Sequence, residues 1–147
     1  MGIKIKVDIF IWIKYNKDIQ LDNYQNKIWR VDMSKYIEYL DETIRELKET
    51  EKELVQTDRK DEANIIRIKM NICDIAKTIY NVSAKKNSGS ALKEEYVRQL
   101  TRLPENWKVS YQKAKEHGDV QKILIEETKL EMLQMIKDKF ENLGECE

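Results

Sequence analysis

The sequence predicts a mainly α fold, an antiparallel helical bundle of four to five helices preceded by a short β-like N-terminal arm or hairpin. Three observations support this fold class. Charged residues make up 37% of the chain and hydrophobic residues 41%, a mixture typical of amphipathic helices. The chain has only 4 glycines and 1 proline, so few turns are expected. Beyond residue 33, apolar residues mostly recur at steps of three and four, which is a helical period.

Residues 1–32 have a different pattern and are assigned to the β-like arm. Ile or Val occupies every odd position from Ile3 to Ile13, a period of two that is typical of a half-buried strand. Residues 16–18 are turn-forming, and short apolar groups at 19–21 and 28–31 indicate a return strand and a weaker third strand. A lone hairpin is marginally stable in water, so the arm is expected to lie on the helices or on another chain.

The arm has an alternative interpretation at the level of the gene. The single codon for Trp29, followed by one of the several codons for Arg30, would form a purine-rich ribosome-binding sequence at a natural distance before Met33. The three residues from Met33 also resemble a bacterial N-terminus. On this interpretation residues 1–32 are translated upstream sequence, and the native protein is the helical bundle domain 33–147. The strict alternation at the start of the chain argues against it, and the nucleotide sequence distinguishes the two.

The central helix, residues 64–86, is expected to hold the core. Its main apolar stripe has spacings of three and four, and Cys73 widens the stripe as a small core residue. An α-helix is predicted rather than a strand, because the apolar positions do not alternate. The stripe consists of Ile65, Ile68, Ile72, Ile75, Ile79 and Val82.

A helix from Ser34, its expected N-cap, to Gln56 is predicted to fold back on the central helix through a polar turn at residues 57–61. The predicted register places Leu54 beside Ile65 and Leu40 beside Ile79. A single long helix that pairs as an antiparallel dimer is the competing arrangement, and it would bury aspartates in its seam. Charge favours the hairpin, because net charges of −4, +5 and −4 follow one another over residues 33–58, 59–93 and 119–147.

Three further helices are expected after a loop at residues 87–90. The first runs from a cap at Ser90 to about residue 102, and Pro104 begins the second. Gly118 should end that helix, because glycine tolerates the left-handed conformation at a helix C-terminus. Asp119 is expected to cap the last helix, which should end at Gly144.

The residue types argue against catalysis, so no enzyme activity, cofactor or metal site is predicted. The chain has one histidine and two widely separated cysteines, which excludes the common zinc and Cys–His patterns. No glycine-rich phosphate loop or serine nucleophile motif occurs. The net charge is zero, so the whole molecule should not attract nucleic acid or anionic membrane. No apolar run is long enough to cross a bilayer, and a cytoplasmic location is expected.

Two candidate binding regions are nevertheless present. Trp and Tyr anchor many protein interfaces, although at helical spacing they are more often core residues. Basic residues around the 87–90 loop could contact an anion, assisted by the N-terminus of the following helix. The candidate partner-binding residues are Trp107, Tyr111, Phe10 and Trp12, and the candidate anion or nucleic-acid contacts are Lys85, Lys86, Lys93, Arg98 and Arg102.

The leading functional prediction is a small intracellular protein–protein interaction module, a regulator or inhibitor that binds a protein partner and catalyses nothing. The reason is that the sequence predicts a well-packed helical core and contains no recognisable set of catalytic residues. The alternative is a nucleic-acid-binding regulator that uses the basic region from Lys85 to Arg102. Homo-oligomerisation is compatible with either function.

Overall fold

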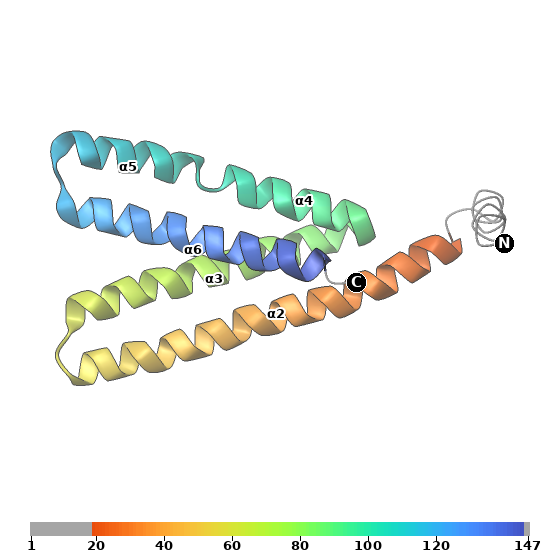
Figure 1. Ribbon diagram of the computed structural model, residues 1–147, viewed down its shortest axis with the longest axis horizontal. Helices are drawn as coiled ribbons and strands as arrows, with labels where there is room; N and C mark the ends of the chain where they lie inside the picture. The colour runs from red at the N-terminus through yellow and green to blue at the C-terminus, as the bar shows by residue number, and fades with distance from the viewer. Residues whose placement is uncertain (1–18, 146–147) are drawn as a thin grey trace.

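A computed structural model describes residues 19–145 of the chain, and the side chains of residues 33–143. Within this range the protein is mostly helical and has no strand. Figure 1 shows α2 and α3 as an antiparallel hairpin, α4 and α5 following one another in one direction, and α6 returning beside them. The predicted helical bundle is therefore confirmed. The helices among residues 19–145 are α2 (Ile19–Gln56), α3 (Lys60–Lys86), α4 (Gly89–Arg102), α5 (Glu105–His117) and α6 (Val120–Glu145).

The turn between α2 and α3 closes the predicted hairpin. Asp58 adopts a left-handed backbone with φ 59°, a conformation that aspartate tolerates better than most residues. The Arg59 N–H donates to the Leu54 carbonyl at 2.8 Å, and the Asp58 N–H donates to the Val55 carbonyl at 3.2 Å. This pair of bonds satisfies two carbonyls in the last turn of α2. The competing arrangement of one continuous helix is excluded.

Two ion pairs between α2 and α3 report the register of the hairpin. Arg67 Nε donates to Glu51 Oε1 at 2.9 Å, and Lys77 Nζ donates to Asp41 Oδ1 at 2.6 Å. The predicted register places residues 51 and 41 opposite residues 68 and 78, so it is correct to within one residue. Exposed pairs of this kind contribute about 0–1 kcal/mol each, so the apolar seam stabilises the hairpin.

The predicted start of the first helix is wrong. α2 begins at Ile19, so residues 19–21 and 28–31 are helical rather than return and third strands, and Ser34 is not an N-cap. Two or three apolar residues are too few to separate a period of two from one of 3.6, which explains the error. The predicted strand from Ile3 to Ile13 lies outside the described residues.

The ends of the later helices follow the expected chemistry with small shifts. Gly118 has φ 64° and ends α5, and Asp119 Oδ1 accepts a bond from the Lys122 N–H at 3.1 Å, as predicted. α4 begins at Gly89 instead of at a Ser90 cap, and its N-cap is Ser88. α6 continues through residue 144 to Glu145, one residue past the predicted end.

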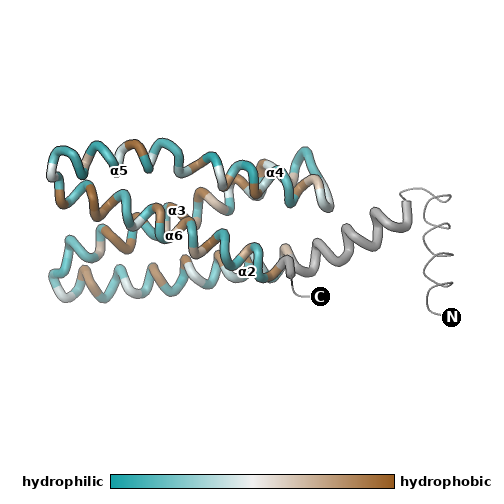
Figure 2. Tube along the Cα trace, turned by 45° about the horizontal axis from the view of Figure 1, so that its top comes forward, coloured by the Kyte–Doolittle hydropathy of each residue, from teal (hydrophilic) through white to brown (hydrophobic). Residues whose placement is uncertain are grey.

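The closely packed core lies where four helices meet, and the face that α3 presents to it differs from the predicted stripe. Cys73 and Ala76 are fully buried, whereas Val82 is 54% exposed, so the predicted burial of Val82 is wrong. α3 contacts α2, α4 and α6, and these neighbours rotate its buried face toward Cys73. Figure 2 shows hydrophobic positions recurring along α3 and α6 between hydrophilic ones. The core cluster is Met33, Tyr36, Leu40, Ile72, Cys73, Ala76, Tyr96, Leu100, Met132, Leu133, Ile136 and Phe140.

Candidate functional site

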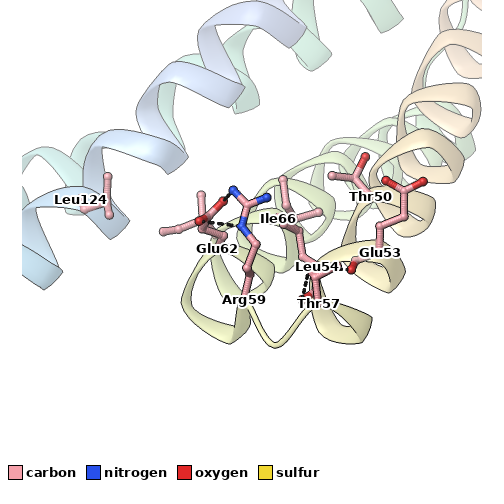
Figure 3. A pocket seen from close by; sticks show the side chains of 9 residues that line it. Thr50, Glu53, Leu54, Thr57, Arg59, Glu62, Ile66 and Leu124 are labelled. Atoms are coloured by element: carbon pink, nitrogen blue, oxygen red, sulfur yellow. Dashed lines mark hydrogen bonds and ion pairs between the residues drawn. The ribbon is translucent and has the colours of Figure 1, made fainter.

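A groove lies at the end of the bundle where α2 turns into α3, and we call it the hairpin groove. It comprises two hollows of about 630 and 810 Å³ that share Ile65 of α3 and Leu124 of α6. Figure 3 shows the first hollow, with Leu124 on one side and Thr50 and Glu53 of α2 on the other. The apolar side chains that line the groove are Leu54, Ile65, Ile66, Ile68, Val120, Leu124 and Ile125.

Two residues of the hairpin groove expose much of their apolar surface. Val120 is 77% exposed and Leu124 is 49% exposed, and both belong to the first turns of α6. Across the groove, Ile65 and Ile68 of α3 are half-buried. Single exposed apolar residues are ordinary, but several gathered in one concave surface mark a binding site more often than chance placement does.

The groove remains open because the core is centred elsewhere. The fully buried cluster draws on residues 33–40, 72–76, 96–100 and 132–140. The groove residues of α3 precede residue 72, and those of α6 precede residue 132. α4, which covers the core beside the C-terminal half of α3, does not line either hollow. Val120 and Leu124 therefore lack the layer that covers their counterparts in the core.

The rim of the hairpin groove is acidic. Glu53 and Glu62 line the first hollow together with Arg59, and Asp61 lines the second. Arg59 Nε donates to Glu62 Oε1 at 3.0 Å, so the one arginine of the rim is engaged with a rim carboxylate (Figure 3). Three carboxylates and one guanidinium leave a net charge of −2. The groove thus combines an apolar floor with a negative edge.

The structure places the predicted aromatic residues in the seam between α5 and α6. Trp107 is half-buried and packs against the core, and Lys129 Nζ lies 5.7 Å from its ring centre. The Tyr111 hydroxyl donates to Glu127 Oε1 at 2.8 Å. Both aromatics therefore contact α6, and these contacts serve packing within the bundle. Phe10 and Trp12 lie outside the described residues.

The predicted basic residues surround the connection between α3 and α4 but do not form one compact cluster. Lys85 and Lys86 are exposed at the end of α3, and Lys93 is half-buried early in α4. Arg98 forms an ion pair with Glu95 of its own helix, which offsets its charge. Arg102 is exposed at the far end of α4, about 14 Å along the helix from Lys93.

None of the predicted site residues lines the hairpin groove, so this surface was missed. A signal is present in the sequence. Ile123, Leu124 and Ile125 are consecutive, and with Val120 they cover more of the helix circumference than one neighbour can bury. An apolar arc that wide indicates either two packing neighbours or a surface left for a partner. In the structure Val120 and Leu124 lie on an open surface.

Two properties bear on other kinds of site. Among the residues that the structure describes, no group of three or more His, Cys, Asp or Glu side chains could hold a metal ion. None of the helices in the same range combines the length and hydrophobicity that crossing a membrane requires.

In comparisons with known proteins, no family model, curated protein or solved structure matches this chain.

Proposed function

We propose that this protein is a small binding module without catalysis of its own, which holds an apolar, positively charged segment of a protein partner in the hairpin groove. The observation that carries this proposal is the continuity of the two hollows through Ile65 and Leu124. A helix or strand of a partner could lie along both without crossing a polar barrier.

The energetics favour a partner segment with two or three large apolar side chains. Complete burial of one leucine or valine contributes about 1.5–3 kcal/mol, and Leu124 and Val120 both have surface left to bury. Recognition of an amphipathic segment in an apolar groove uses anchors of this type. The rim carboxylates of Glu53 and Asp61 favour lysine or arginine beside the apolar anchors, and disfavour acidic segments.

A random peptide library provides the direct test. The full chain is immobilised at low density, so that neighbouring molecules do not meet, and binding peptides are selected. We expect enriched peptides to combine large apolar residues with lysine or arginine. Their affinity should fall at least about tenfold for Leu124→Glu and for Val120→Glu, a loss of about 1.4 kcal/mol or more.

A matched control separates the groove from general surface hydrophobicity. Val109 on α5 is 55% exposed and lines neither hollow, so Val109→Glu should leave peptide binding unchanged. Circular dichroism of the three variants checks that each is folded. The proposal is wrong if no peptides are enriched, or if the enriched peptides bind the Leu124→Glu chain as tightly as the unchanged chain.

A further inference from the structure

We infer that the segment held in the hairpin groove is residues 3–13 of a second copy of this chain, an inference that rests on the proposed function of the groove. Eight of these eleven residues are large and apolar, from Ile3 to Ile13. If each side chain gains about 1.5–3 kcal/mol on complete burial, leaving this segment in water is expensive. The chain therefore carries both an apolar segment that needs cover and an apolar groove that lacks it.

The charges of the segment and of the groove are complementary. Residues 3–14 contain three lysines and one aspartate, a net charge of +2. The rim formed by Glu53, Arg59, Asp61 and Glu62 carries −2. Each exposed pair adds only about 0–1 kcal/mol, so charge selects this segment over acidic ones while the apolar contacts supply most of the affinity.

The segment cannot lie along its whole length in the groove of its own chain. From Ile19, where α2 begins, to Leu54 in the groove is 35 residues, about 52 Å along a helix. Figure 1 shows the start of α2 at one end of the molecule and the turn into α3 at the other. Between Ile13 and Ile19 an extended chain spans at most about 22 Å. For Ile13 the connection falls short by about 30 Å, so a segment that lies in the groove along its whole length has to come from another copy.

Two copies can fill each other's hairpin grooves if their α2 helices run in opposite directions. The start of α2 in each copy then lies near the hairpin groove of the other copy. Such a two-fold arrangement is closed, because each copy gives one segment and receives one. Assembly therefore stops at the dimer and does not continue into filaments.

Complementation between two full-length variants tests this exchange. The groove variant is Leu124→Glu, and the segment variant carries Ile9→Glu and Ile11→Glu. We expect the unchanged chain to sediment as a dimer and each variant alone as a monomer. In a mixture, an intact segment meets an intact groove once per pair, so the mixed dimer should form at least about tenfold more tightly than either variant self-associates.

A peptide with the sequence of residues 1–18 gives a second readout. It should bind the segment variant, whose groove is free and intact, and should not bind the groove variant. The control Val109→Glu should remain a dimer. A chain that stays monomeric at about 100 µM overturns the inference, as does a mixture no tighter than the separate variants. If library peptides still bind the groove in that case, the proposed function stands; if they do not, both fail.

Discussion

The hydroxyl groups of Tyr36 and Tyr96 lie 2.6 Å apart in the centre of the bundle, and both side chains are fully buried. The Tyr96 hydroxyl donates its proton to the Ala76 carbonyl at 3.1 Å, so the proton between the two tyrosines belongs to Tyr36. Both rings meet Phe140 edge to face, at centre distances of 4.9 and 5.0 Å. This short chain of bonds joins α2 to α4 and α4 to α3.

Replacement of the two tyrosines by phenylalanine should have unequal effects. Tyr96→Phe leaves the Tyr36 proton without an acceptor in the core, and we expect a loss of about 1–3 kcal/mol in the free energy of unfolding. Tyr36→Phe removes one bond but leaves Tyr96 still donating to Ala76, so about 0.5–1.5 kcal/mol is expected. Urea denaturation measures both. The double variant should cost less than the sum, and equal costs for the two single variants would contradict the proton assignment.

The free energy of unfolding should fall at alkaline pH, because a buried thiol and two buried phenol groups stay neutral in the folded protein. Burial raises the pKa of the Cys73 thiol to about 12, with a smaller contribution from the charge of Asp74. In the unfolded chain a thiol titrates near pH 8.5, so the unfolded state releases its proton first as the pH rises. The contribution of Cys73 is therefore complete below about pH 8.5 and is lost toward pH 12. Burial also raises the pKa of Tyr36 and of Tyr96, which extends the loss above pH 10.

Denaturation across this pH range checks the assignment to Cys73. Each such group should lower the free energy of unfolding by up to about 1.4 kcal/mol per pH unit above its unfolded-state pKa. The variant Cys73→Ala should lack the part of the decline between about pH 8.5 and 10, whereas the part due to tyrosines remains. A decline of unchanged slope in Cys73→Ala would show that another group is responsible.

The ion pair between buried Glu126 and half-buried Lys129 should be less favourable than an apolar replacement of Glu126. Lys129 Nζ lies 3.2 Å from Glu126 Oε1, while Glu126 Oε2 is buried without a hydrogen-bond partner. The Lys129 side chain is 26% exposed and can turn toward water if its partner is removed. We therefore expect Glu126→Leu to be neutral or to stabilise the fold by about 1–3 kcal/mol, because it removes a carboxylate whose desolvation is incompletely offset.

The reciprocal variant tests the same argument with the opposite sign. Lys129→Met keeps the apolar stem but leaves the Glu126 carboxylate buried without a counter-charge. We expect it to destabilise the protein by about 1–3 kcal/mol, as thermal denaturation would show. A Glu126→Leu variant that is as destabilised as Lys129→Met would show that the carboxylate makes a net favourable contribution.

Two residues with a left-handed backbone, Gly118 and Asp58, should respond in opposite directions to substitution. Gly118 has φ 64°, and a methyl group added there meets nothing within 4 Å, so Gly118→Ala introduces backbone strain alone. We expect a loss of about 1 kcal/mol. Asp58 has φ 59° with a side chain already present, and Asp58→Gly should be neutral or gain about 0.5 kcal/mol. Urea denaturation measures the free energy of unfolding of both variants. The value for Gly118→Asn should lie between those of Gly118→Ala and the unchanged chain.

Local patterns predict those parts of the fold in which neighbouring residues decide the outcome. The isoleucine spacing of residues 65–79 indicates the central helix, and the polar turn at 57–61 indicates the hairpin. Gly118 and Asp119 mark one helix end and the next helix start, because left-handed backbone and N-cap bonds depend on single residue types. The start of α2 was not predictable in the same way, because the few apolar residues between Ile19 and Val31 fit either period.

The amino-acid sequence by itself determined which side chains share a face of each helix, since that depends only on the helical period. Only the tertiary structure decided which faces are covered, because coverage depends on how many helices arrive beside a given turn. The helix stripes that contain Val82 and Leu124 are as apolar as those that contain Ile72 and Ile136. Val82 and Leu124 are nevertheless about half exposed, whereas Ile72 and Ile136 are buried. The hairpin groove is the consequence, since α4 covers the half of the bundle away from the turn between α2 and α3 and leaves that turn open.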